Sequence, residues 1–124
     1  MKMTSLHKGC VSRCIDDYTG IWEIIREVQR AYPDANACEV QERTLGVIRD
    51  LLVAGYIVAG DLKDNVGVVP WPSSLEETIR RIKEEWNAFG REPSIWEIVW
   101  FDSTVEGKGA LADDKELNIP EGSS

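Results

Sequence analysis

The sequence predicts a single α+β domain in which a three-helix core and an inserted amphipathic helix pack on a small antiparallel sheet. Three observations indicate this fold class. Apolar residues recur at helical spacing in several stretches, a β-branched stretch interrupted by polar turn residues is typical of a hairpin, and an apolar run near residue 100 indicates one further strand. A length of 124 residues fits one hydrophobic core.

The predicted domain covers residues 16–110. Residues 1–15 show no clear apolar period and carry Lys2, Lys8 and Arg13, so we expect a flexible basic arm. The chain after Thr104 is rich in acids, glycine and serine, and its last part, residues 111–124, is predicted to be an acidic, loosely ordered tail.

The first helix is expected to begin after Thr19, a candidate N-cap. It ends at Tyr32, because the residue before a proline avoids the helical region. A helical stretch follows from about residue 37 to residue 54, capped by Asp34 or Asn36. A break near residues 43–44 would divide that stretch into two short helices, which is the arrangement we expect.

The stretch from Tyr56 to Trp71 predicts a hairpin whose turn is Lys63-Asp64-Asn65, with Pro70 confined to an edge or a strand end. Ser74 then caps a strongly amphipathic helix that ends at Gly90. The last predicted element is the strand from Ile95 to Phe101. Its apolar residues on both alternations indicate a strand covered on both faces or placed in the middle of a small sheet.

Charge limits the partners that the chain can bind. The sequence has 22 acids and 14 bases, a formal net charge of −8. A negative body is repelled by the phosphates of a nucleic acid duplex and attracts a basic protein. The composition therefore favours a basic protein partner over DNA, although the need for solubility alone would account for the same charge.

Cysteine number and hydropathy bear on location. Three cysteines, an odd number in a chain large enough to build a core, indicate reduced thiols and a cytoplasmic protein. No apolar run approaches the roughly 18 residues of a membrane span. The first ten residues also lack the apolar stretch of a secretory signal. We expect no membrane association, and the sequence leaves the oligomeric state open.

Three phrases of the sequence carry a family resemblance. They are IWEIIREVQRAYP as a first helix, TLGVIRDLLVAGYIVAGDL as a third helix that runs directly into a strand, and WFDSTVEGKGAL as a strand and the start of a closing helix. Together they resemble a winged helix-turn-helix domain over about residues 18–110. The resemblance implies a three-helix core with a hairpin wing, to which this chain adds the amphipathic helix after the hairpin.

The same resemblance implies DNA binding through the helix from about residue 43 to residue 54. Its exposed candidates are Gln41, Arg43, Thr44 and Arg49. Three acids flank them, Glu39, Glu42 and Asp50, and the wing is also net acidic. Such a mixture is not a phosphate-binding surface. A winged-helix DNA-binding transcriptional regulator is therefore the alternative function and not the preferred one.

Five tryptophans are too many to be fully buried in so small a core. We expect Trp22 and Trp86 in the core. An exposed aromatic patch rimmed by acids is typical of a protein-binding surface, and the predicted partner-binding residues are Trp71, Trp96, Trp100, Glu84, Glu85, Asp61 and Asp64. The preferred function is a non-enzymatic, acidic protein-binding module, more specifically an inhibitor or immunity protein that neutralises a basic partner such as a nuclease toxin in the bacterial cytosol.

Chemistry-bearing motifs are sparse. His7 is the single histidine and lies in the predicted arm, and the sequence has neither a phosphate-binding glycine loop nor a nucleophile elbow, so we expect no enzyme and no cofactor. Cys10 and Cys14, with Cys38 and His7, would offer four zinc ligands, but the spacing lacks the paired knuckles of structural zinc sites. Incidental thiols are the expected outcome, and no metal is assigned.

Overall fold

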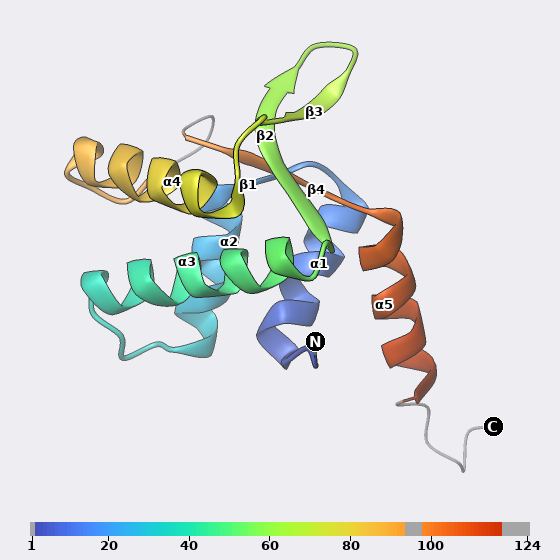
Figure 1. The fold of residues 1–124 in the computed structure, drawn as a ribbon. Coiled ribbons are helices and arrows are strands. Elements are labelled where there is room, and N and C mark those ends of the chain that lie inside the picture. Colours follow the sequence, from blue (N-terminus) through green and yellow to red (C-terminus); the bar gives the residue numbers. More distant parts are fainter. Residues whose placement is uncertain (1, 94–97, 118–124) are drawn as a thin grey trace.

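The computed structural model describes residues 2–93 and 98–117 (Figure 1). Its elements, in chain order, are α1 (Ser5–Asp16), β1 (Thr19–Gly20), α2 (Ile21–Ala31), α3 (Ala37–Val53), β2 (Ile57–Lys63), β3 (Gly67–Pro70), α4 (Leu75–Phe89), β4 (Trp100–Ser103) and α5 (Val105–Leu117). The strands form one antiparallel sheet in the order β1-β4-β2-β3. The predicted α+β class is confirmed at this level.

Helix α1 occupies the segment predicted to be a flexible arm, and that prediction was wrong. The Thr4 hydroxyl accepts a hydrogen bond from the backbone N–H of His7, and the His7 ring accepts one from the backbone N–H of Thr4 at 3.0 Å. His7, Cys10, Val11 and Cys14 are buried and recur at helical spacing. The stripe was missed because Val11 is the one aliphatic residue among these four, which leaves the apolar period faint.

Helix α2 begins one residue later than predicted. Gly20 is its N-cap, and the Glu23 carboxylate accepts the Gly20 N–H at 3.2 Å. Thr19 is buried in β1 instead. The helix ends at Ala31 with Tyr32 as its C-cap, as the following proline requires.

Helix α3 is continuous, so the predicted break near residues 43–44 was wrong. Asn36 caps it through the backbone N–H of Glu39 at 2.9 Å. The buried face continues through the expected break, because Thr44 lies on it and is fully buried. After the helix, Gly55 adopts a left-handed conformation with φ of 75°, which suits a glycine at a helix C-terminus.

The predicted hairpin is confirmed as β2 and β3, and Pro70 lies at the end of the edge strand β3. Strand β4 pairs with β1 on one side and β2 on the other, which confirms its expected place in the middle of a small sheet. It starts later than predicted, at Trp100, and Ile98 has φ of 69°, which interrupts an extended run. Residues 95–97 of the predicted strand lie outside the described residues.

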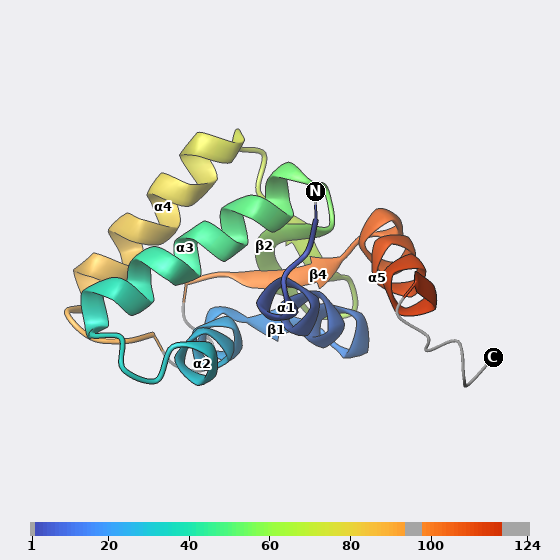
Figure 2. The same ribbon diagram turned by 90° about the horizontal axis from the view of Figure 1, so that it is seen from below.

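Helix α4 follows the prediction: the Ser74 hydroxyl accepts the backbone N–H of Glu77, and Gly90 ends the helix in a left-handed conformation. Helices α1 to α3 lie against one side of the sheet, α4 runs alongside α3, and α5 packs next to α1 at the opposite end of the molecule (Figures 1 and 2). The tail predicted from residue 111 is helical as far as Leu117, and Leu111 is buried. That part of the tail prediction was wrong; residues 118–124 lie outside the described part.

Truncation of Trp86 tests the packing of α4. Trp86 and Ile82 are the large apolar residues of this helix that are buried, whereas Phe89 is 40% exposed. We expect Trp86→Ala to lower the free energy of unfolding by about 3–5 kcal/mol through the cavity it leaves. Phe89→Ala, the matched control, should change it by less than about 1 kcal/mol. Equal urea midpoints for the two variants would show that α4 is not fastened through Trp86.

The buried thiols predict a loss of stability at alkaline pH. Burial raises the pKa of Cys10 and of Cys14 to about 12. In the unfolded chain a thiol titrates near 8.5. The unfolded state therefore loses these protons first, so the stability they contribute is complete below about pH 8.5 and falls as the pH rises towards 12.

We expect the urea midpoint to fall between about pH 8.5 and 11, and to fall less steeply in Cys10→Ala/Cys14→Ala. Comparing slopes removes the contribution of the other groups that titrate in this range. Parallel pH profiles for the two proteins would contradict the assignment.

Candidate functional site

The helix that the family resemblance assigns to DNA is covered along one side by α4 (Figures 1 and 2). Two side-chain contacts join the helices at the surface. The Gln41 side-chain amide donates to the Asn87 Oδ1 at 2.8 Å, and the Arg49 guanidinium binds the Glu76 carboxylate. The bond to Arg49 lowers the pKa of the Glu76 carboxyl and so keeps this ion pair charged.

The remaining two candidates of α3 are also engaged within the fold. The Arg43 guanidinium lies over the Tyr32 ring, 3.9 Å from its centroid. Thr44, expected to be exposed, is fully buried, because the core face of α3 runs through it. Its hydroxyl has no hydrogen-bond partner among the described residues. All four predicted DNA-contacting side chains therefore make contacts inside this chain.

The structure brings three predicted partner-binding residues together beside the hairpin. Trp71 is buried, and its indole N–H donates to the Asp61 carboxylate at 3.1 Å. The Arg81 guanidinium lies over the Trp71 ring, 3.6 Å from the centroid, and its Nε donates to Glu85 at 2.8 Å. The arginine is thus stacked on an indole and bound by one carboxylate, that of Glu85. The stacking of Arg81 on Trp71 joins α4 to the end of β3.

The other predicted partner-binding residues are dispersed. Asp64 is exposed in the turn of the hairpin, and Glu84 is exposed on α4. Trp100 lies half-buried at the start of β4, on a different part of the surface from Trp71. Trp96 lies outside the described residues. As contacts to a partner, these residues remain predictions.

A second aromatic cluster lies where α1, β1 and α2 meet β4. The rings of Trp22 and Trp100 meet edge to face, with centroids 5.4 Å apart and an interplanar angle of 88°. Both rings are half-buried, and Tyr18 beside them is 40% exposed. The three aromatic residues line a recess of about 430 Å³ that opens to solvent. We call it the Trp22–Trp100 recess.

Gly20 determines how the Trp22 ring lies in this recess. A Cβ at residue 20 would stand 1.6 Å from the Trp22 ring, so only a glycine permits the ring to lie over the strand. Gly20 pairs with Trp100 in the β1–β4 ladder. The Trp22 indole therefore packs over β1 and against Trp100 of the neighbouring strand. The absence of a Cβ at Gly20 permits this orientation.

Charged side chains surround the same recess. Three carboxylates, those of Asp16, Asp17 and Glu23, line it together with one guanidinium, that of Arg13. Arg13 donates to Glu27 at 2.7 Å and to Glu23 at 3.2 Å, and the hydrogen bond to Glu27 raises the pKa of Arg13. The single cation is therefore bound by carboxylates of α2, and the lining as a whole is negative.

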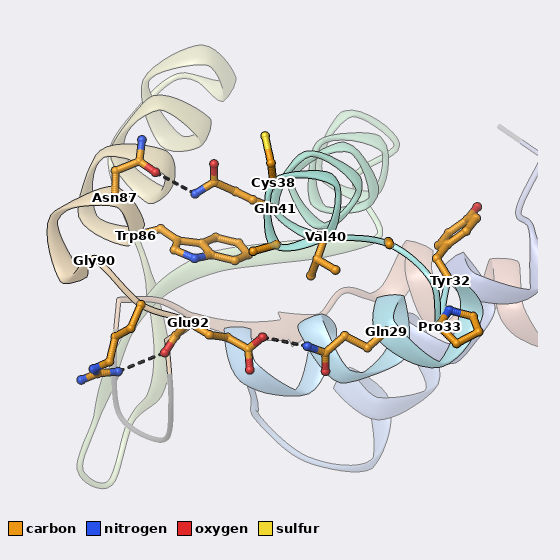
Figure 3. A pocket seen from close by; sticks show the side chains of 13 residues that line it. Gln29, Tyr32, Pro33, Cys38, Val40, Gln41, Trp86, Asn87, Gly90 and Glu92 are labelled. Carbon is orange, nitrogen blue, oxygen red and sulfur yellow. Dashed lines mark hydrogen bonds between the residues drawn. The ribbon is translucent and has the colours of Figure 1, made fainter.

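A larger pocket, of about 640 Å³, lies where the end of α2, the start of α3 and the end of α4 meet (Figure 3). Trp86 forms part of its floor. Gln41 bonds Asn87 on one side, and the Gln29 amide donates to Glu92 at 2.7 Å on the other. Dashed lines in Figure 3 mark these two side-chain pairs, Gln41 with Asn87 and Gln29 with Glu92. They fasten the end of α4 to the corner between α2 and α3.

The cysteines considered as zinc ligands are not gathered at one place. Cys10 and Cys14 are buried on α1, whereas Cys38 is exposed on α3. The raised pKa values of Cys10 and Cys14 keep both thiols protonated at neutral pH. Among the side chains that the structure describes, no group of three or more His, Cys, Asp or Glu could hold a metal ion.

Comparisons of the chain with protein-family models, with curated proteins and with solved structures gave no match. None of the described helices combines the length and the apolar character needed to cross a membrane. The function must therefore be argued from the residues and their geometry.

Sequence reasoning missed Tyr18 and Trp22 as members of a site. Trp22 was assigned to the core because it borders the apolar face of its helix. The partner that keeps its ring near the surface, Trp100, is distant in the sequence and adjacent only through strand pairing. The succession Asp-Asp-Tyr-Thr-Gly was the available signal, since it sets two carboxylates beside an aromatic side chain.

Substitution of Gly20 tests the geometry of the recess. We expect Gly20→Ala to displace the Trp22 ring, because the new methyl group and the ring cannot occupy the same space, and to lower stability by about 1–3 kcal/mol. Gly46→Ala is the matched control. Gly46 lies exposed within α3 with nothing near its Cβ position, so alanine should raise stability by about 0.5–1 kcal/mol.

Urea denaturation and near-ultraviolet circular dichroism measure the two effects. The aromatic dichroism should change in Gly20→Ala and stay unchanged in Gly46→Ala. An unaltered aromatic spectrum in Gly20→Ala would contradict the described position of Trp22.

Proposed function

We propose that this chain is a non-enzymatic, acidic protein-binding module whose partner is a basic protein. The observation that carries the proposal is the engagement of α3. A DNA-reading helix needs several side chains that extend into the major groove and bind base edges and phosphates. Here Arg43 stacks on Tyr32, Arg49 pairs with Glu76, and α4 occupies one side of the helix.

The winged-helix type is retained as part of the proposal. In its support, α3 leads through Gly55 into β2, and β4 leads through Thr104 into α5, in the order of the phrases that carry the resemblance. The Thr104 hydroxyl donates to the Gly55 carbonyl and accepts from the Gly107 N–H, which ties the closing helix to the end of α3. Strands β2 and β3 then correspond to the hairpin wing, and helix α4 is the addition between the wing and β4.

A basic partner is favoured by charge. The chain carries a net charge of −8, and the recess that exposes tryptophan surface is lined by three carboxylates and one arginine. Aromatic anchors surrounded by polar and charged residues are the usual centres of protein interfaces. A small acidic protein with such a surface suits an inhibitor or immunity protein that binds a nuclease toxin in the cytosol, and this is the narrower form of the proposal.

The first test is for DNA binding. We expect no shift of duplex DNA in a gel at about 0.15 M ionic strength, because the predicted DNA face lacks available cations and the chain is acidic. Arg43→Glu/Arg49→Glu should leave this result unchanged. A sub-micromolar shift whose affinity falls linearly with salt on logarithmic axes, and which the double variant abolishes, would replace the proposal with the winged-helix regulator.

The second test concerns the partner. We expect capture from a lysate cleared of nucleic acid, followed by purification, to yield a protein of basic isoelectric point. In stopped-flow experiments its association rate should fall steeply as salt increases, because opposite charges steer the encounter. An association rate indifferent to salt would show that the acidity serves solubility alone, and the inhibitor hypothesis would then be abandoned.

A further inference from the structure

We infer that the Trp22–Trp100 recess receives an arginine side chain of the basic partner. The inference rests on the proposed function and names the place and the chemistry of the contact. The recess combines two features that recognise a guanidinium: ring surface that is open to solvent, from Tyr18, Trp22 and Trp100, and carboxylates at the rim, from Asp16 and Asp17.

The aromatic surface is formed before any partner arrives. Gly20 holds the Trp22 ring over β1, and Trp100 meets it edge to face from the neighbouring strand. A cation over the face of an indole is attracted by the ring quadrupole, and more strongly so when partly removed from water. Because the rings already lie in place, binding would order few additional side chains.

The two aspartates lie at the end of α1, where negative charge is unfavourable. Asp16 is the last residue of α1 and Asp17 is its C-cap, so both carboxylates face the negative end of the helix dipole. Among the described residues neither carboxylate forms an ion pair, and the Asp17 carboxylate accepts one local hydrogen bond, from the backbone N–H of Tyr18 at 2.8 Å. Arg13, the cation of the recess, is already bound to Glu23 and Glu27. A cation supplied from outside would relieve this repulsion.

The chain itself contains the filled form of this arrangement. Beside the hairpin, Arg81 lies over the Trp71 ring, Glu85 binds the Arg81 Nε, and Asp61 accepts the indole N–H. An arginine is favoured over a lysine at such a place, because its planar guanidinium both stacks on an aromatic ring and forms paired hydrogen bonds with a carboxylate. In the Trp22–Trp100 recess aromatic rings and carboxylates likewise lie side by side, and its own cation, Arg13, is bound to Glu23 and Glu27.

A peptide titration of the full chain tests the recess directly. The probe is acetyl-Gly-Arg-Gly-amide, and the control peptide carries citrulline, the neutral isostere of arginine. Indole N–H signals in ¹⁵N-labelled protein, assigned by single Trp→Phe variants, report where the peptide binds. We expect the signals of Trp22 and Trp100 to shift with the arginine peptide alone, while those of the buried Trp71 and Trp86 stay in place. No shift at Trp22 and Trp100, or equal shifts with citrulline, would overturn the inference.

A pair of charge-matched variants separates the recess from general charge. Asp16→Asn/Asp17→Asn removes two negative charges at the recess, and Asp34→Asn/Asp113→Asn removes two from exposed positions elsewhere. We expect the first pair to raise the dissociation constant of the arginine peptide by about five- to tenfold and the second by less than about twofold. The first pair should also raise the thermal midpoint, since it removes repulsion at the end of α1. Equal weakening by both pairs would overturn the inference.

The same variants distinguish this inference from the proposed function. If a basic partner binds with a salt-dependent association rate but both variant pairs weaken it equally, the module is acidic and protein-binding while the recess is not its docking point. If the arginine peptide binds the recess and the captured partner dissociates at least about fivefold faster from the Asp16→Asn/Asp17→Asn variant alone, the inference is supported for the protein partner as well.

Discussion

The pairing of β4 with β1 and β2 is the constraint on which the rest of this structure depends. Phe101 is fully buried between Thr19 on one neighbouring strand and Ala59 on the other. The pairing closes the sheet over the helices and directs the chain into α5. It also places Trp100 opposite Gly20. A late segment of the chain thereby completes a surface that the first two helices begin, and the proposed docking recess exists only because of that strand.

Helix α4 changes what α3 can do. A helix of this kind, left uncovered, would present its outer side chains to solvent or to a ligand. Here α4 lies along it and supplies Asn87 and Glu76 as partners for Gln41 and Arg49. These surface contacts contribute little individually to stability. Their consequence is that Gln41 and Arg49 are bonded to α4, so α3 presents fewer polar groups to a ligand.

Stability and function conflict at the end of α1. Two adjacent carboxylates at the negative end of a helix dipole oppose the fold, and the nearest cation, Arg13, is drawn away by two glutamates of α2. Natural chains retain such costs where a site needs them, because selection removes destabilising residues only when they bring the protein below its stability threshold. If an arginine of the partner binds the Trp22–Trp100 recess, Asp16 and Asp17 are residues of this kind.

Much of the fold was determined by local patterns that the sequence shows on its own. The amphipathic period of α4, the cap at Ser74 and the glycine at its end are local signals, and each is confirmed. So are the hairpin with Pro70 at its edge and the central place of β4. Local physics suffices in these places because caps, turns and apolar periods act within a few residues of one another.

Only the tertiary structure decided the rest. Cysteine and histidine side chains become core residues when a helix packs over them, so α1 could not be told from an arm by its composition. Thr44 allows α3 to continue because its side chain lies inside, where the helix meets its neighbours. The recess depends on two tryptophans that strand pairing brings 5.4 Å apart. The physical reason is the same throughout: burial and contact between distant segments are properties of the packed chain, and a residue's own neighbours in the sequence do not determine them.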